Sequence, residues 1–374
     1  MSELPVDVIV DILSRLPVKP LLRFRCISKS WHALIDSPDF IKLHLNRSVE
    51  TNTNRSIIFR DCGLHSIDFD SLDDDPVELV HPLKNGGGFE VVGSCDGLLC
   101  LCYSEKDITL WNPSTRKHHK LPITPIEFPL ECGSINHFII YGFGYDSVSD
   151  DYKVVRLIEY YDRYYDSLGS EVKVYSLKLN SWRRIQDFPY SFRTWGVNAV
   201  LASGALHWAV YQITEGSLIA AFDLGVEEFR FMPQPDYLDK NGEIFLEVLG
   251  GCLCIVSYHV RTCDVDIWVM MEYGVKESWT RLIYVAQPSF LYMRPLAYSK
   301  SGGEVLVVED CGRLLEYDLK TKTIKNIEIL GTHICLGSHT DVHVCFGSLV
   351  PLRVDDEISK QKDEVKKKRR KIEA

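Results

Sequence analysis

Apolar residues recur at helical spacing through the first forty positions of the chain. They follow one another three or four residues apart, a periodicity that predicts amphipathic helices. The positions are Val8, Ile9, Ile12, Leu13, Leu16, Leu21, Leu22, Phe24, Ile27, Trp31, Leu34 and Ile35. Pro5 suits a first helical turn, Pro17 and Pro20 interrupt the pattern, and Ser28 is a candidate N-cap. Three short helices are therefore expected, the last of them ending at Pro38.

This helical unit carries more apolar side chains than it can enclose. Val6 and Val10 lie away from the stripe formed by Val8, Ile9 and Ile12, so apolar groups point in several directions. A bundle of about forty residues cannot bury all of them by itself. The unit either packs against the rest of the chain or presents an apolar face to a partner, and periodicity alone leaves both readings open.

From about residue 55 the helical period gives way to short alternating runs separated by glycine, Asp-Gly and Asn-Pro turns. Five units of strand, turn, strand, loop, strand, turn and strand can be traced, beginning near Val91, Phe143, Leu201, Leu249 and Glu304. Their spacing of roughly 45–65 residues is typical of four-stranded propeller blades. Weaker strands at 56–59 and 67–69 supply a further blade, and 343–346 supplies a closing strand. The pattern predicts an all-β, propeller-like domain of about six blades, with a β-sandwich as the alternative.

The chain thus divides into a small all-α unit at residues 1–45, a large β domain at 46–354 and a charged tail at 355–374 that is expected to be disordered. The net charge of −10 lies in the β domain, because both ends are slightly basic. An acidic body repels phosphate, which argues against nucleic-acid binding. The tail contains the run 366–371, KKKRRK, a candidate nuclear import signal.

The cysteines and the N-terminus predict an intracellular protein. The twelve cysteines include no CxxC pair, and the CxC pairs Cys100/Cys102 and Cys252/Cys254 lie in alternating apolar runs, as expected for buried, reduced thiols. No stretch approaches the roughly 18 apolar residues of a membrane span. The acidic first residues do not form a signal peptide. We expect a cytoplasmic and nuclear location.

The sequence contains no specific catalytic or metal-binding motif. Cys95 lies where a nucleophile elbow would place its serine, but Asp96-Gly97 reads as a hairpin turn between strands. His118, His119 and His343 lack partners at ligand spacing. No metal, cofactor or catalytic residue is expected.

The N-terminal segment resembles the F-box motif of plant F-box proteins. The resemblance rests on Leu4-Pro5, on the run from Val8 to Pro17 and on Cys26-Ile27-Ser28-Lys29-Ser30-Trp31. In that family the helices bind a Skp-type adaptor, which links to a cullin and a RING subunit. The resemblance implies that the adaptor-docking surface is formed or supported by Leu4, Pro5, Ile9, Ile12, Leu13, Leu16, Pro17, Val18, Leu21, Leu22, Phe24 and Trp31.

The β domain resembles the plant F-box-associated domain of type 1, which is kelch-like. The matching segments are 94–98 (SCDGL), 110–115 (LWNPST), 142–146 (GFGYD), 152–155 (YKVV) and 174–177 (VYSL). The resemblance implies a non-catalytic substrate-recognition subunit of an SKP-cullin-F-box ubiquitin ligase, which promotes ubiquitination and proteasomal degradation of a bound protein. Related groups include S-locus F-box proteins and regulators of plant immune receptors, and the defence branch is the closer. The alternative is a propeller enzyme or small-ligand sensor with a helical cap.

Two loops are candidates for target binding because they combine aromatic side chains with arginine. One is 159–166, with Tyr161, Arg163 and Tyr164, and the other is 287–294, with Phe290, Tyr292 and Arg294. Some of these aromatics alternatively cover blade edges. The acidic charge of the domain suggests a basic patch on the unidentified protein substrate.

Overall fold

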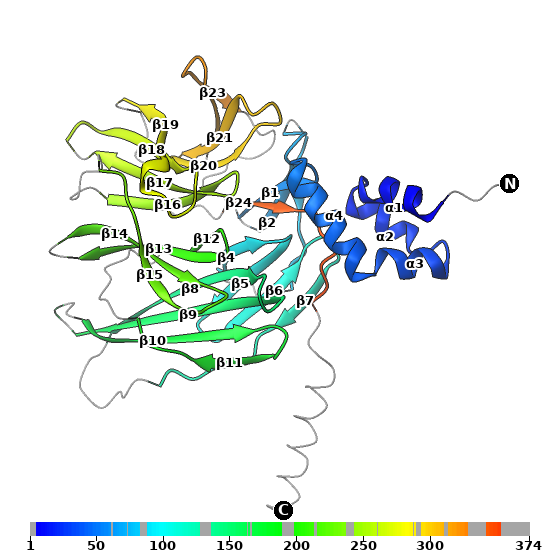
Figure 1. Cartoon of the computed structure of the whole chain (residues 1–374), viewed down its shortest axis with the longest axis horizontal. Helices are drawn as coiled ribbons and strands as arrows, with labels where there is room; N and C mark the ends of the chain where they lie inside the picture. The colour runs from blue at the N-terminus through cyan, green and yellow to red at the C-terminus, as the bar shows by residue number, and fades with distance from the viewer. Residues whose placement is uncertain are drawn as a thin grey trace, which may run out of the picture.

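The computed structural model places a group of helices at the N-terminus against a ring of six β-sheets (Figure 1). The structure describes residues 5–60, 63–72, 74–82, 88–127, 136–162, 164, 167–188, 198–212, 215–236, 243–259, 261–286, 288, 293–309, 313–327 and 342–352. Within these ranges, no helix has the length and apolar character needed to cross a membrane.

The N-terminal unit contains α1 (Val6–Ser14), α2 (Val18–Phe24), α3 (Lys29–Ile35) and α4 (Pro38–Glu50). The three expected helices are present, and Ser28 caps α3 by accepting a hydrogen bond from the Trp31 amide at 3.2 Å. The third helix ends before Pro38 as expected, but Pro38 also begins a fourth helix that was not expected. Proline is tolerated in a first turn, and Ser37 caps the new helix by accepting from the Phe40 amide at 3.3 Å. Helix α4 therefore continues past residue 45, where the helical unit was expected to end.

Each β-sheet is an antiparallel blade of four strands. The first blade has the order β24-β1-β2-β3, and the other five run in chain order outward from the centre of the ring. The strands of the first three blades are β24 (Val342–Phe346), β1 (Arg55–Arg60), β2 (Leu64–Asp68) and β3 (Val77–Glu78); β4 (Glu90–Cys95), β5 (Leu98–Ser104), β6 (Asp107–Asn112) and β7 (Lys117–Lys120); and β8 (Asn136–Asp146), β9 (Asp151–Tyr161), β10 (Ser167–Ser176) and β11 (Ser181–Arg184).

The remaining blades are β12 (Val200–Ala202), β13 (Ala205–Gln212), β14 (Gly216–Asp223) and β15 (Phe229–Met232); β16 (Glu243–Leu249), β17 (Cys252–His259), β18 (Asp264–Met270) and β19 (Trp279–Val285); and β20 (Met293–Tyr298), β21 (Glu304–Glu309), β22 (Leu314–Asp318) and β23 (Ile324–Ile327). A short 3₁₀ helix, η1 (Lys276–Ser278), precedes β19.

The blades close into a ring. The six inner strands β24, β4, β8, β12, β16 and β20 contact one another in that order and then return to β24. The late strand expected at 343–346 is β24, which pairs antiparallel with β1, so the two ends of the domain complete one blade. The predicted propeller of about six blades is confirmed, and the β-sandwich alternative is wrong.

Apolar side chains hold the blades together between their faces. The described residues form six buried clusters, each shared by one pair of neighbouring blades. The cluster between the second and third blades also contains Val18, Leu21 and Ile41 from the helices. The helical unit is therefore continuous with the propeller core.

The two faces of the ring differ in the length of their connections. The helices lie at the end where β4 stops at Cys95, and there the strands are joined mostly by short turns such as 96–97, 203–204 and 250–251. The opposite end is where the outer strand of one blade stops and the inner strand of the next begins, as at Arg184 and Val200 and at Val285 and Met293. We call this opposite end the loop face. Binding residues usually lie on such loops, so the loop face is the candidate target side.

Ring closure by β24 predicts a large difference between two truncations. A chain ending before Val342 loses the β1–β24 pairing and leaves the edge of β1 open, whereas a chain ending after Leu352 keeps it. We expect the first truncation to lower the melting temperature well below that of the second, as measured by circular dichroism or calorimetry. Equal melting temperatures would contradict closure of the ring by this strand.

Candidate protein-binding sites

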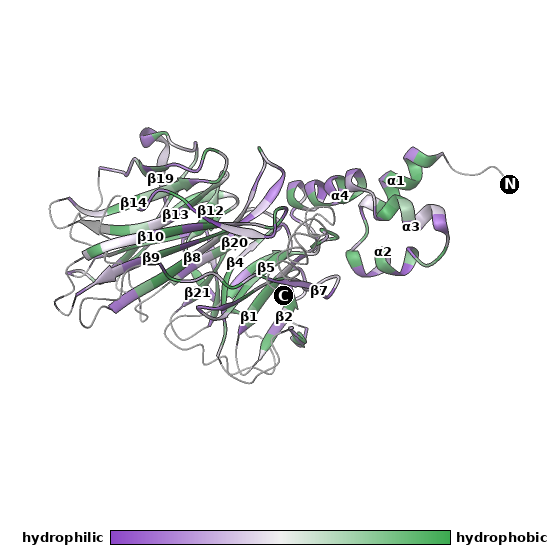
Figure 2. Ribbon diagram, turned by 90° about the horizontal axis from the view of Figure 1, so that it is seen from below, coloured by the Kyte–Doolittle hydropathy of each residue, from purple (hydrophilic) through white to green (hydrophobic). Residues whose placement is uncertain are grey.

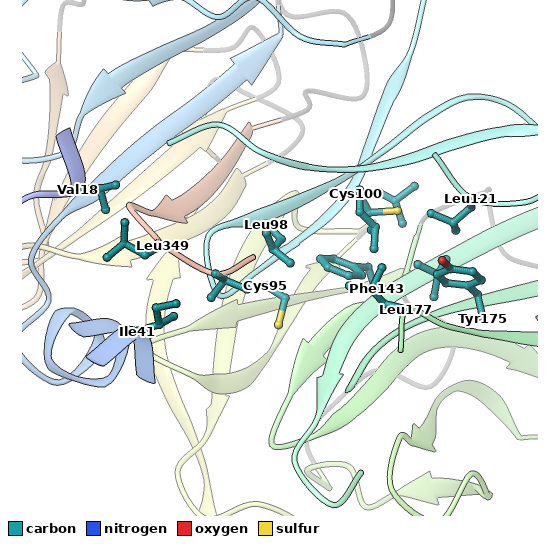
Figure 3. Close-up of a cluster of buried hydrophobic side chains, with 14 of the residues drawn as sticks. Val18, Ile41, Cys95, Leu98, Cys100, Leu121, Phe143, Tyr175, Leu177 and Leu349 are labelled. Atoms are coloured by element: carbon teal, nitrogen blue, oxygen red, sulfur yellow. The ribbon is translucent and has the colours of Figure 1, made fainter. Parts of the chain in front are cut away.

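The helical unit has a small core of its own, made by residues predicted for the docking surface. Leu13, Val18 and Leu21 are buried, together with Ile35 and Phe40. These side chains join the cluster that reaches Leu349, Cys95 and Leu98 of the propeller, as Figure 3 shows for Val18 and Ile41 beside Leu349. Leu13, Val18 and Leu21 therefore pack in the core beneath the exposed residues of the helices.

An apolar surface remains exposed on α1 and at the start of α3. Ile12 is 48 % exposed, Val6 66 % and Ile27 61 %, and Val8 is also exposed. Helices α1, α2 and α3, which carry or adjoin these residues, project from the propeller (Figure 2). Monomeric soluble proteins rarely leave contiguous apolar patches uncovered, so this surface is suited to a protein partner.

The other predicted docking residues surround this surface. Pro5 and Pro17 are exposed, and the half-buried members are Ile9, Leu16, Leu22, Phe24 and Trp31. Phe24 and Trp31 meet edge to face with their ring centroids 5.6 Å apart, which joins α2 to α3. Leu4 lies outside the described residues. Apart from Leu4, the structure brings the predicted set together on three adjoining helices.

Polar contacts of α4 fix the docking helices. Arg47 donates to Asp11 Oδ1 at 2.8 Å and to Ser14 Oγ at 2.6 Å, both on α1. The buried His44 ring nitrogen Nε2 lies 2.9 Å from the Leu16 carbonyl oxygen, which accepts its hydrogen bond. Burial lowers the pKa of His44 below its ordinary value of 6.5, because the charged ring would lose its hydration. The sequence prediction missed α4 and with it this framework.

Helix α4 also contacts the propeller directly. Lys42 forms an ion pair of 2.9 Å with Asp150, which lies in the turn between β8 and β9. The Tyr145 hydroxyl donates a second hydrogen bond to the same carboxylate. Both groups of the ion pair are exposed, so its contribution to stability is about 0–1 kcal/mol. It links α4 to the third blade at the molecular surface.

The first candidate target loop lies at the loop-face end of the third blade. Tyr161 ends β9 and stacks on Phe138 of β8, with ring centroids 4.8 Å apart. Tyr164 is 66 % exposed and Leu168 is also exposed. Strands β8, β9 and β10 are longer than those of the other blades, so this aromatic end extends beyond its neighbours. Arg163 lies outside the described residues.

The second candidate loop is not assembled as the sequence suggested. Phe290 and Tyr292 lie outside the described residues. Arg294 is not in a loop but in the inner strand β20, where its Nε lies 2.5 Å from Glu247 Oε1 on β16. Arg294 thus pairs with a buried carboxylate on the neighbouring inner strand and is not part of a loop.

Polar groups do converge near the centre of the ring. Besides the Arg294–Glu247 pair, Asn198 donates to Glu90 Oε1 at 2.6 Å. Burial and the nearby Arg294 guanidinium lower the pKa of His343, on β24, to about 3. His343 is therefore neutral at physiological pH. Among the described residues, no three His, Cys, Asp or Glu side chains are placed to hold a metal ion.

Of the residues considered for catalysis, Cys95 is buried and His119 is hydrogen-bonded to the neighbouring blade. Cys95 is buried at the end of β4, and burial together with the Asp96 carboxylate raises the pKa of its thiol well above the ordinary value. A nucleophilic cysteine needs the opposite shift. His119 Nε2 lies 2.9 Å from the Tyr175 hydroxyl and 3.2 Å from Asn180 Oδ1, contacts between neighbouring blades.

Comparison with known families agrees with this geometry. Residues 1–43 match the F-box domain, and residues 69–347 match the F-box associated beta propeller domain. The chain belongs to the F-box proteins with an F-box associated β-propeller. Its architecture is that of a substrate-recognition subunit of an SCF-type ubiquitin ligase, in which the F-box binds a Skp-type adaptor.

Relatives from Arabidopsis thaliana match along most of the chain. F-box protein CPR1 is 40 % identical over 355 residues, covering 88 % of this chain and 85 % of the relative. F-box protein At4g22390 is 36 % identical, covering 87 % and 85 %, and F-box/kelch-repeat protein At3g23880 is 31 % identical, covering 82 % and 85 %. A solved oligogalacturonate lyase in complex with manganese covers 75 % of this chain and 76 % of its own, but at 10 % identity and a TM-score of 0.45 it carries no argument about function.

The buried His44 predicts acid sensitivity of the docking helices. Its pKa is lowered in the folded state, so its stabilising contribution is present above pH 6.5 and is lost as the pH falls through the lowered pKa. We expect the adaptor affinity and helical content to fall between pH 7 and pH 5. A His44→Gln variant, which keeps a donor for the Leu16 carbonyl but does not titrate, should show a flatter pH profile. An equally steep profile in that variant would assign the effect to other groups.

Proposed function

We propose that the chain joins two proteins, holding a Skp-type adaptor on α1, α2 and α3 and a target protein on the loop face of the propeller. The observation that carries this proposal is the exposed apolar surface around Ile12, which lies on helices that project from the ring. The loop face lies at the other end of the ring, so both proteins fit on the chain at once.

The chain itself performs no bond-forming step in this scheme. A cullin and a RING subunit, recruited through the adaptor, bring the ubiquitin-carrying enzyme, and the propeller raises the local concentration of the target lysine. The gain depends on keeping the target within reach, so a fixed angle between helices and ring is part of the function. Ubiquitination and proteasomal degradation of the target follow.

The aromatic end of the third blade is the proposed target contact. Tyr161 and Tyr164 offer apolar area with hydroxyl groups for directed hydrogen bonds, a combination common in binding hot spots. The net charge of −10 favours a target with a basic patch. From the sequence resemblance we also propose plant immune receptors as the target class. We propose a nuclear as well as a cytoplasmic location because of the basic run 366–371, which lies outside the described residues.

Adaptor binding is tested by charge substitution on the exposed helix surface. Ile12→Asp, alone or with Val8→Asp, should weaken adaptor binding by about 2 kcal/mol or more, roughly thirtyfold in Kd, because an exposed isoleucine that becomes buried is worth that much. The measurement is titration calorimetry or a pull-down. Val49→Asp is the matched control, since Val49 on α4 is 46 % exposed. Unchanged affinity in the Ile12 variants would reject the assigned surface.

Target binding is tested on the third blade. Tyr161→Ala combined with Tyr164→Ala should raise the cellular level and half-life of a protein that wild-type chain captures under proteasome inhibition. Adaptor binding and melting temperature should stay unchanged, because the end of the blade is remote from the helices. Tyr284→Ala, at another exposed tyrosine near the loop face, is the control. Wild-type turnover of the captured protein in the double variant would remove this loop from the recognition surface.

A further inference from the structure

Two sequence motifs of the second blade lie apart from both proposed binding surfaces. They are 94–98 (SCDGL), the turn between β4 and β5, and 110–115 (LWNPST), the end of β6 and the following turn. Neither lies on the loop face or on the docking helices. In the structure both motifs contact the same short piece of chain, residues 347–352, which follows the closing strand β24. We call residues 347–352 the strut.

Asn112 holds the strut through its side-chain amide. Its Nδ2 donates to the Ser348 carbonyl at 3.1 Å and to the Val350 carbonyl at 3.0 Å. Its Oδ1 accepts from the Ser114 and Thr115 amides at 2.9 and 3.1 Å, which caps the turn between β6 and β7. Asn112 is fully buried, so all of these hydrogen bonds are shielded from water. One amide therefore joins a blade turn to a segment more than 200 positions later in the chain.

The other motif leaves room for the strut. Gly97 has φ of +79°, and a Cβ atom built there would lie 2.3 Å from Ser348 Cβ and 2.4 Å from the Phe346 carbonyl oxygen. Only glycine accommodates both the left-handed backbone and this close approach. The Ser348 amide also donates to Ser114 Oγ at 3.3 Å. The strut is thus seated in a place shaped by both motifs.

The opposite side of the strut contacts the helical unit. Leu349 and Val350 are buried in the same cluster as Val18 and Ile41 (Figure 3). The Gly347 amide donates to the Asn54 carbonyl at 2.7 Å, just after α4. Asn54 in turn donates to the buried Ser48 Oγ of α4 at 2.9 Å. The strut therefore lies between the helices and the second blade and touches both.

We propose that residues 347–352, held by Asn112, are the element that sets the orientation of the adaptor-binding helices relative to the propeller. Asn112 acts as a positioning residue, because it touches neither adaptor nor target. Among the described residues, one side-chain ion pair joins the helices to the blades, the exposed Lys42–Asp150 contact, which is weak in water. The functional meaning of this inference rests on the proposed function, but the geometry it predicts does not.

The variant that separates positioning from turn stability is Asn112→Asp. A carboxylate keeps the Oδ1 acceptor for the turn amides, as Asp318 does in the β22–β23 turn, where it accepts from the Lys320 and Thr321 amides at 2.8 and 2.7 Å. It loses both donors and places negative charge against two carbonyl oxygens. Asn112→Ala removes the donors without adding charge. Asp318→Asn is the matched control, because Asp318 caps the same kind of turn without touching the strut.

Two exposed native cysteines, Cys26 between α2 and α3 and Cys263 between β17 and β18, provide labelling sites on the two parts. The full-length chain carries spin labels at these two positions. The buried Cys95, Cys100, Cys254 and Cys345 are kept, and serine replaces all remaining cysteines. Double electron–electron resonance then measures the distance distribution between the labels. We expect a narrow distribution in the wild type and in Asp318→Asn, and a broadened, shifted one in both Asn112 variants.

An Asn112 variant with the wild-type distribution would overturn the proposal. Loss of the native melting transition in both Asn112 variants, with Asp318→Asn intact, would overturn it too, because Asn112 would then be needed for folding rather than for orientation. Adaptor binding is measured in parallel on the same variants without labels, because Cys26 adjoins the exposed Ile27, and it should be equal in all of them, since Asn112 lies in a blade and not on the docking helices. A wild-type chain that fails to bind adaptor contradicts the proposed function and leaves the distance result standing by itself.

Discussion

The pairing of β1 with β24 is the contact on which the rest of the molecule depends. It closes the ring, since β24 is the inner strand that touches β20 on one side and β4 on the other. It also brings both ends of the β domain to one place. The chain leaves α4 and enters β1, and it leaves β24 and passes under the helices, so ring closure and helix placement share the same residues. Strands so far apart in sequence pair only after a large loss of chain entropy, which the six clusters between blades must offset.

The division of the molecule into two faces follows from this arrangement. Tight turns with left-handed residues such as Asp96 and Gly97 leave one end of the ring smooth enough for helices and C-terminal segment to pack on it. The longer connections are left to the other end, where sequence can vary without disturbing the blades. The helices and the proposed target side are thereby separated by the depth of the ring, so the two proposed binding surfaces share no residues.

Much of this architecture can be predicted from the sequence. The strand alternation, the repeat spacing and the late strand at 343–346 predict the closed propeller, because each reports a local burial pattern. The apolar surplus of the first helices leaves open whether they pack on the large domain or expose an apolar face, and the structure shows both, with Val18 and Ile41 in the propeller cluster and Ile12 and Val8 exposed. Helix α4 was missed because Pro38 was taken as an end signal, although Ser37-Pro38 also fits a helix start. Arg294 was misplaced because strand β20 begins beside the loop, and the strut was missed because long-range contacts of Asn112 leave no local pattern.

The long separation in sequence between the helices and the strut has a consequence for biosynthesis. The docking helices are among the first residues to leave the ribosome, whereas Gly347 to Leu352 are among the last of the described ones. At translation rates of about 5–20 residues per second, roughly 17 to 70 seconds separate the two events. During that interval a nascent chain carries complete helices on an open arc of blades and lacks the strut. Synthesis of residues 347–352 therefore marks the moment at which a nascent chain can first fix the angle between its helices and its ring, and chains terminated before these residues would have complete helices without that constraint.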